Sequence, residues 1–247
     1  MLHLYHGPLV KLRLNPSNRE FTVSKDLLCA ESKILAVMFE EGRFKESQQM
    51  EANLNEEEHI VSVRSVEALI QWIYIRVVKF DVEDPGENIT AAMELVRLAD
   101  LYFITGLETE MAQYIKKIII ANPGPKRTGT SKSKYDTLSE RDTHWLNAEH
   151  IISATYLRPD HPVRQTLAAA CVAGFIQHYP GKFHKLTDDY PSFRADLARQ
   201  VVPVMKISSL LPSYRTFEDP ISGEELEMGP ETVFLRGSED ETEDFAR

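Results

Sequence analysis

The sequence predicts an α+β fold, in which a small three-stranded sheet is covered by helices and followed by an all-α extension. Three short segments near the N-terminus alternate apolar and polar residues, which is the period of a half-buried strand. The segments between and after them carry apolar residues at helical spacing instead. An interval rich in Pro, Gly and Lys then precedes a second group of helical segments. Because three strands with one apolar face need helices to cover that face, the first two observations belong to one domain.

The three strands are expected at 10–14, 20–23 and 49–54. In the first, Val, Leu and Leu alternate with Lys and Arg, and Asn15-Pro16-Ser17-Asn18 then supplies a turn. Between the second and third strands, the stretches 27–30 and 34–39 have the apolar pattern of two short helices. Gly42 is expected to end the second of these helices, and Phe44 to return to the core.

More helices are expected after the strands, with apolar stripes over 66–73, 92–99 and 107–118. A short strand is a further possibility at Val77–Phe80. Thr105 and Glu108 have the spacing of a capping box, which predicts that Thr105 caps the third helix and that Glu108 reaches back to it.

The domain boundaries follow from the changes in composition. Residues 1–120 are expected to form the α+β domain, 121–142 a flexible basic linker, and 143–211 a helical extension. Residues 212–247 are acidic with little periodicity, and we expect them to be disordered. Eleven acids and three arginines after Tyr214 give this tail −8 of the net charge of −10.

Composition and charge exclude several classes of protein. A hydrophobic fraction of 43% and a charged fraction of 27% are ordinary for a soluble globular chain. The sequence has no apolar run of the roughly 20 residues that span a bilayer and no signal-peptide pattern, so we expect the protein in the cytoplasm or the nucleus. Its two cysteines suit a reducing compartment. The acidic total argues against duplex DNA as a partner. The basic stretch Lys116–Lys134 leaves nuclear import or RNA contact as an alternative, although a solvated linker fits it better.

Catalytic and cofactor motifs are not convincing. Gly124–Ser131 imitates a phosphate-binding loop, but Thr130 stands where the loop needs a lysine. The histidines and cysteines lack metal-site spacing, so no metal and no cofactor is expected. Cys29 and Cys171 fit small core residues better than nucleophiles. The sequence therefore predicts that the protein is not an enzyme, with a nucleotide-binding enzyme as a remote alternative.

Four separated motifs resemble the BTB/POZ domain family. They are Val23-x-Lys25-x-Leu27-Leu28-Cys29-Ala30-x-Ser32, Met38-Phe39-x-x-Gly42-x-Phe44-x-Glu46-Ser47, Gln71-Trp72-Ile73-Tyr74, and Leu98-Ala99-Asp100-x-Tyr102-x-Ile104-x-x-Leu107. They occur in the order of the family and span roughly Leu9 to Ile120. A second resemblance covers Tyr156 and His161-Pro162-Val163-Arg164, which are similar to the helical extension of short fungal BTB proteins.

The resemblance implies a non-enzymatic protein–protein interaction module, a scaffold or adaptor. Members of the family bind cullin-3 or transcriptional co-regulators, and many homodimerise. Tyr74 matches a position that touches cullin in adaptors, and Phe80 and Asp81 lie where that contact continues. Lys25 and Leu28 match the dimer face. A cullin-3 type ubiquitin-ligase adaptor is therefore one expectation, and a self-associating, transcription-linked scaffold without a ligase role is the other.

Overall fold

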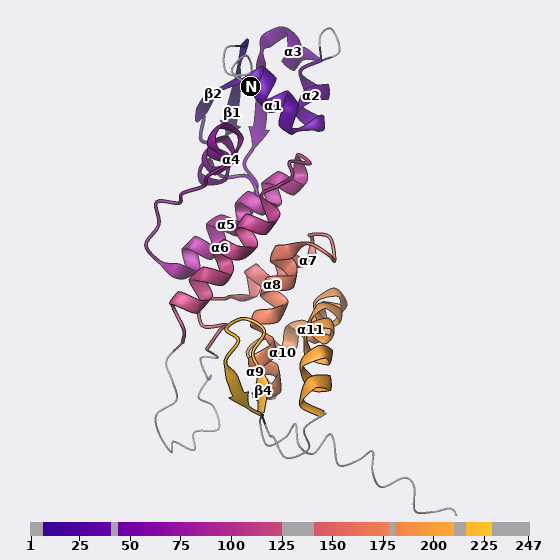
Figure 1. Ribbon diagram of the computed structural model, residues 1–247. Coiled ribbons are helices and arrows are strands. Elements are labelled where there is room, and N and C mark those ends of the chain that lie inside the picture. The colour runs from indigo at the N-terminus through magenta and orange to yellow at the C-terminus, as the bar shows by residue number, and fades with distance from the viewer. Residues whose placement is uncertain (1–6, 41–43, 125–140, 178–180, 210–215, 229–247) are drawn as a thin grey trace, which may run out of the picture. The chain divides into compact units, whose positions relative to one another are not determined.

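The computed structural model describes residues 7–40, 44–124, 141–177, 181–209 and 216–228 (Figure 1). The chain divides into two compact units, Met1–Tyr114 and Ile115–Arg247. The division falls inside helix α6 (Glu108–Ala121), so one continuous helix belongs to both units. Within the described residues, no helix is both long and apolar enough to cross a membrane.

The first unit contains the predicted three-stranded sheet. Strand β1 (Leu9–Asn15) lies between β2 (Glu20–Ser24), which is antiparallel to it, and β3 (Glu51–Asn55), which is parallel. The buried face carries the alternating apolar residues of β1 and their partners on the other two strands. The opposite face carries charges, including an ion pair between Arg13 and Glu20. The sheet therefore has one core face and one solvent face, as its sequence period requires.

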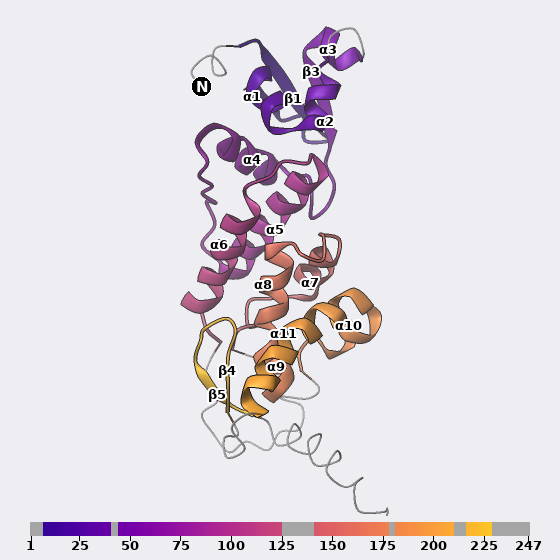
Figure 2. The same cartoon turned by 45° about the vertical axis from the view of Figure 1, so that its right-hand side comes forward.

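Two short helices lie beside this sheet (Figure 2), and a serine caps each of them. Ser24 caps α1 (Lys25–Glu31) by accepting from the Leu27 backbone N–H, and Ser32 caps α2 (Lys33–Met38) by accepting from the Leu35 backbone N–H. The remaining helices of this unit are α3 (Lys45–Gln49), α4 (Val63–Ile75), α5 (Pro85–Leu101) and the first part of α6.

The α4–α5 pair is joined by a partly buried charge network. Arg64 on α4 donates to both carboxylate oxygens of Glu94 on α5, at 2.8 and 2.6 Å, and Glu94 is only 6% exposed. Ser62, which caps α4, also donates to Glu94. Because the buried carboxylate accepts three hydrogen bonds, its desolvation is compensated.

The structure corrects three details of the first unit. Phe44 is 44% exposed and does not return to the core, whereas Phe39 is fully buried as expected. Residues 77–80 form no strand; the Lys79 N–H is instead satisfied by the Gln71 side chain. Glu108 reaches back as predicted, but it accepts from the Gly106 N–H. Gly42 lies outside the described residues.

The second unit is mainly helical. It contains α7 (Ala148–Thr155), α8 (Pro162–Ala170), α9 (Val172–Gln177), α10 (His184–Asp189) and α11 (Pro191–Ser209). Arg164 of α8 is its central polar residue, because it pairs with Asp196 of α11 and donates to the carbonyl oxygens of Thr155 and Leu157 at the end of α7. Arg164 and Asp196 are 6% and 1% exposed.

The sequence predicted a disordered tail over 212–247, but residues 216–228 of it are folded. Strands β4 (Thr216–Glu218) and β5 (Glu225–Glu227) form an antiparallel hairpin. Phe217 and Ile221 are each 3% exposed, and this burial explains why the segment is ordered despite its charge. The turn sequence Asp219-Pro-Ile-Ser-Gly223 carries the residues that favour turns.

The predicted linker, 121–142, is described only at its two ends. Helix α6 continues to Ala121, and the Gly124 N–H donates to the Arg141 carbonyl oxygen at 2.8 Å. Lys182 fixes the segment after Arg141, since its Nζ donates to the carbonyl oxygens of Thr143 and Leu146 at 2.6 Å each. The rest of the predicted linker, including most of the loop Gly124–Ser131, lies outside the described residues.

Candidate docking surface around the α1–α2 junction

Helix α4 ends in a rigid arrangement around Arg76. Arg76 adopts the left-handed conformation (φ 57°) that closes the helix, and its N–H donates to the Trp72 carbonyl oxygen. The guanidinium lies 5.4 Å from the centre of the Trp72 ring and pairs with Glu31 at the end of α1. A cation held between an aromatic face and a carboxylate has little freedom to move. The end of α4 is thus fixed to the end of α1.

Helix α5 is fixed to the next residue of the same junction. Ser32, which caps α2, donates through its hydroxyl to the Tyr102 carbonyl oxygen at 2.7 Å. Glu31 and Ser32 are consecutive, so the C-terminal ends of α4 and α5 are both tied to the α1–α2 junction. Gly106, at a φ of 93°, lies near the same ring, since a Cβ atom at its position would be 3.8 Å from Trp72.

Both helix ends expose large apolar side chains. Ile75 and Val77 flank Arg76 and are 64% and 59% exposed; Leu101 and Phe103 flank Tyr102 and are 47% and 67% exposed. We call these four side chains the junction surface. Exposed apolar side chains on a rigid support are the features that protein partners bind.

Phe103 has a second unusual property. Its φ of 52° lies in the left-handed region, which bulky residues rarely adopt. Such strain persists where the surrounding structure imposes it, and it is concentrated at functional positions. Sequence reasoning missed Phe103, because neither an apolar stripe nor a turn motif indicates that a phenylalanine two residues beyond the end of α5 faces solvent.

Tyr74 lies on α4 beside the junction surface, and the structure brings it next to Lys25. Its hydroxyl oxygen accepts from the Ser24 backbone N–H at 2.9 Å, and Lys25 follows directly as the first residue of α1. Both side chains are half-buried. The predicted partner residue Tyr74 and the predicted dimer-face residue Lys25 are therefore neighbours.

The other three predicted site residues lie elsewhere. Leu28 is 1% exposed, which corrects the expectation that its side chain lies on a dimer face: it belongs to the core. Phe80 is half-buried, with its ring centre 5.6 Å from that of Tyr114. Asp81 is exposed next to Phe80. The roles of Phe80 and Asp81 in partner binding stay predictions.

The surroundings of the two cysteines do not activate either thiol as a nucleophile. Burial raises the pKa of the Cys29 thiol, the opposite of what an activated nucleophile requires. Cys171 is buried, and its thiol donates to the Leu167 carbonyl oxygen at 3.2 Å. Among the residues that the structure describes, no three His, Cys, Asp or Glu side chains gather in a way that could hold a metal ion.

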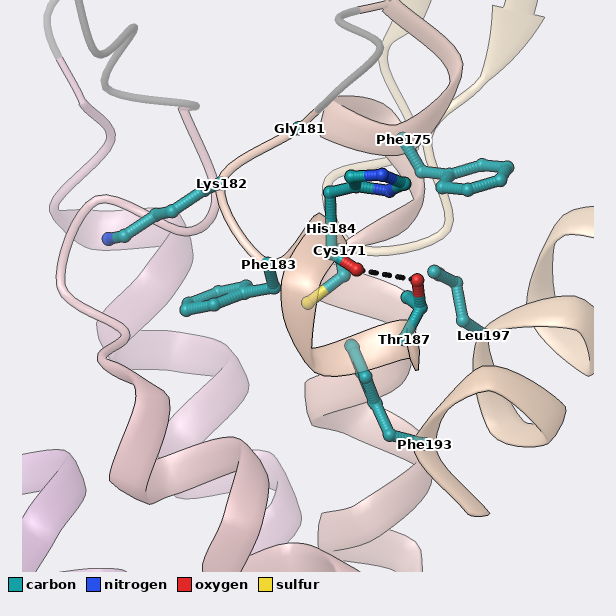
Figure 3. A pocket seen from close by; sticks show the side chains of 9 residues that line it. All are labelled: Cys171, Phe175, Gly181, Lys182, Phe183, His184, Thr187, Phe193 and Leu197. Atoms are coloured by element: carbon teal, nitrogen blue, oxygen red, sulfur yellow. Dashed lines mark hydrogen bonds between the residues drawn. The ribbon is translucent and has the colours of Figure 1, made fainter. Parts of the chain in front are cut away.

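The cavity beside Cys171 is too small for a substrate. Phe175, Phe183, His184 and Phe193 are among the residues that surround it, and the Thr187 hydroxyl donates to the His184 carbonyl oxygen (Figure 3). Its volume is about 20 Å³. That is space for about one water molecule.

A comparison with models of protein families matches residues 9–119 to the BTB/POZ domain. These residues contain the whole sheet, helices α1 to α5, most of α6 and the junction surface. A search of curated proteins found no match to the chain.

Proposed function

Because residues 9–119 of this chain are a BTB/POZ domain, we propose that the protein is a non-enzymatic scaffold or adaptor that binds its partner through the junction surface. BTB/POZ domains are in general protein-interaction modules. The observation that carries the proposal is the convergence of two helix ends on Glu31 and Ser32, which holds four exposed apolar side chains in place. A surface fixed before binding loses little conformational entropy when a partner docks.

The partner that we propose is cullin-3, in a ubiquitin-ligase complex. Tyr74 supports this assignment, since it resembles the cullin-contacting position of adaptors and lies directly before Ile75 on α4. The neighbouring Phe80 and Asp81 extend the proposed contact along the chain. Cytoplasm and nucleus are the compartments that we propose for such a complex, and imaging of the tagged chain tests that placement.

A pull-down with purified cullin-3 tests the adaptor proposal. We expect the full chain to bind, and Phe103→Asp or Ile75→Asp to weaken binding by more than about tenfold, because a charge replaces a buried apolar contact. Tyr156→Asp is the matched control, since Tyr156 is a 66% exposed aromatic residue of the helical unit. Tyr74→Phe separates the role of the hydroxyl from that of the ring.

Two outcomes would contradict parts of this proposal. If the intact chain does not bind cullin-3, the adaptor assignment is wrong. If it binds and the control weakens binding as much as Phe103→Asp does, the junction surface is not the docking site.

The alternative is a self-associating, transcription-linked scaffold without a ligase role. Leu9 favours it: this residue is 57% exposed and opposes Ser24, the residue before Lys25, in the sheet. Light scattering on the full chain tests the alternative. The alternative is supported if the unchanged chain has the mass of a dimer and the Leu9→Asp variant has the mass of a monomer. It is excluded if the unchanged chain is a monomer at all concentrations.

A further inference from the structure

Two buried aspartates interact where the β4–β5 hairpin packs in the helical unit. Asp142 and Asp219 are 5% and 1% exposed. Asp142 Oδ2 and Asp219 Oδ1 are fully buried, and neither has a hydrogen-bond partner within the described structure. Buried polar atoms are nearly always hydrogen-bonded, so two such atoms on adjoining acids require an explanation.

The Asp142 and Asp219 side chains interact with each other, and the other contacts of the hairpin turn do not use these two oxygens. Asp219 uses Oδ2 to accept from both the backbone N–H and the hydroxyl of Ser222, at 2.6 Å each. Arg141, the nearest cation in sequence, is engaged by both carboxylate oxygens of Glu224. Two ionised carboxylates only accept hydrogen bonds, but one proton between them turns the contact into an acid–carboxylate hydrogen bond.

The surrounding charges favour a proton at this position. Burial, and next the charge of Asp219, raise the pKa of Asp142 to about 7, with a smaller contribution from Glu224 and an opposing one from Arg141. Glu218 of β4 and Lys116 of α6 line the groove beside Asp219. On the other side, the Lys182 ammonium is bound to carbonyl oxygens of the segment that follows Asp142. A metal ion would need a third acidic, His or Cys ligand, which the described residues do not supply.

We propose that Asp142 and Asp219 share one proton, and that this bond is a latch that fastens the hairpin to the helical unit more tightly below neutral pH. Loss of the proton leaves two buried negative charges facing each other, and docking of the hairpin weakens. Opening exposes Phe217 and Ile221, which are buried in the latched state. The latch is independent of the junction surface, because every residue in it belongs to the second unit.

Hydrogen exchange on the full chain, read by mass spectrometry, tests the latch. The reporters are the N–H groups of Asp219 and Gly223, which bond within the turn, and the exchange times are scaled for the intrinsic effect of pH. With a pKa of about 7 in the docked state and an ordinary value when undocked, protection should be about tenfold lower near pH 8 than near pH 6. The amides of α8 serve as an internal reference.

Two variants separate the latch from general effects of pH. In Asp142→Asn the amide donates to Asp219 at every pH, so we expect equal protection near pH 6 and pH 8. Asp188→Asn, an exposed aspartate of α10, should behave as the unchanged protein does. A pH-independent hairpin in the unchanged protein, or a tenfold drop that persists in Asp142→Asn, would overturn the proposal.

Two further measurements cover the remaining outcomes. If Asp142→Asn fails to fold, carbon NMR titration of the unchanged protein decides the question. An Asp142 carboxyl that titrates at its ordinary pKa overturns the latch, and one that titrates near neutrality supports it.

A metal control distinguishes a proton from a metal ion. Hydrogen exchange is repeated with a chelator and with added Mg²⁺ or Ca²⁺, and hairpin protection that depends on the metal also overturns the proposal.

Discussion

At the scale of single residues, Phe39 and Phe44 show where an apolar pattern predicts side-chain burial and where it does not. Phe39 caps the end of α2 and Phe44 precedes α3, yet one is fully buried and the other is 44% exposed. Helical period places Phe39 on the inward stripe with Leu35. Phe44 lies beyond the helix, where period no longer applies, so its burial could not be derived from spacing.

We therefore expect Phe39→Ala to lower the free energy of unfolding by about 3–5 kcal/mol, because the ring leaves a cavity in the core. Phe44→Ala should cost less than about 1 kcal/mol, since an exposed ring contributes little packing. Denaturant unfolding of the full chain measures both. Equal costs would show that the burial of the two rings differs less than the structure indicates.

Arg164 carries the second prediction at this scale. Removing one partner of a buried ion pair leaves the other charge uncompensated, so Arg164→Ala should lower the free energy of unfolding by about 3–5 kcal/mol. Arg199 donates to the same Asp196 at 3.1 Å but its side chain is 56% exposed, which makes Arg199→Ala the matched control, with a cost below about 1 kcal/mol. Thermal unfolding measures both variants, and equal melting temperatures would contradict this prediction.

At the scale of helices and strands, local signals were reliable where a segment has a regular apolar period or a clear end signal. The three strands, the two short helices after β2 and the helices α4 to α6 were all expected from period and from end signals such as Asp84-Pro85-Gly86. The β4–β5 hairpin and α10 were missed. Their order depends on tertiary burial of a few side chains, Phe217 and Ile221 in the hairpin, which composition does not reveal.

Helix α5 supplies a test at this scale. The Asp84 side chain caps it by accepting from the Glu87 N–H at 2.8 Å, and Pro85 fits the first turn. Asp84→Ala should cost about 1 kcal/mol of stability. Glu83→Ala, an exposed neighbour, should stay within about 0.5 kcal/mol of the unchanged protein in urea unfolding. Identical midpoints for the two variants would mean that the cap contributes nothing measurable.

At the scale of the whole molecule, the four motifs predicted the BTB/POZ fold, and the family model over residues 9–119 confirms it. The proposed docking surface was not predicted from the sequence, although two residues beside it were. Tyr74 and Lys25 were named from the resemblance, whereas Phe103 and the Glu31–Arg76 pair became visible only when helices distant in sequence were placed together. Contacts between distant segments have no local signature, which is why they were missed.

The charge distribution yields a prediction for the whole chain. With a net charge of −10 the protein should not bind duplex DNA at physiological salt, because phosphate contacts need clustered cations. Fluorescence anisotropy with a labelled duplex measures this. Binding that fell steeply with added salt would contradict the prediction and would point to the basic stretch between Lys116 and Lys134.

The adjacency of Glu31 and Ser32 makes the domain sensitive to changes of chain length at that point. Each residue anchors a different helix end, and no spacer separates them. One amino acid inserted between them would change the spacing of the two anchoring side chains, even if every existing side chain were kept. Relatives that differ by such an insertion should therefore differ in which proteins they recruit, while their sheets and cores remain superimposable.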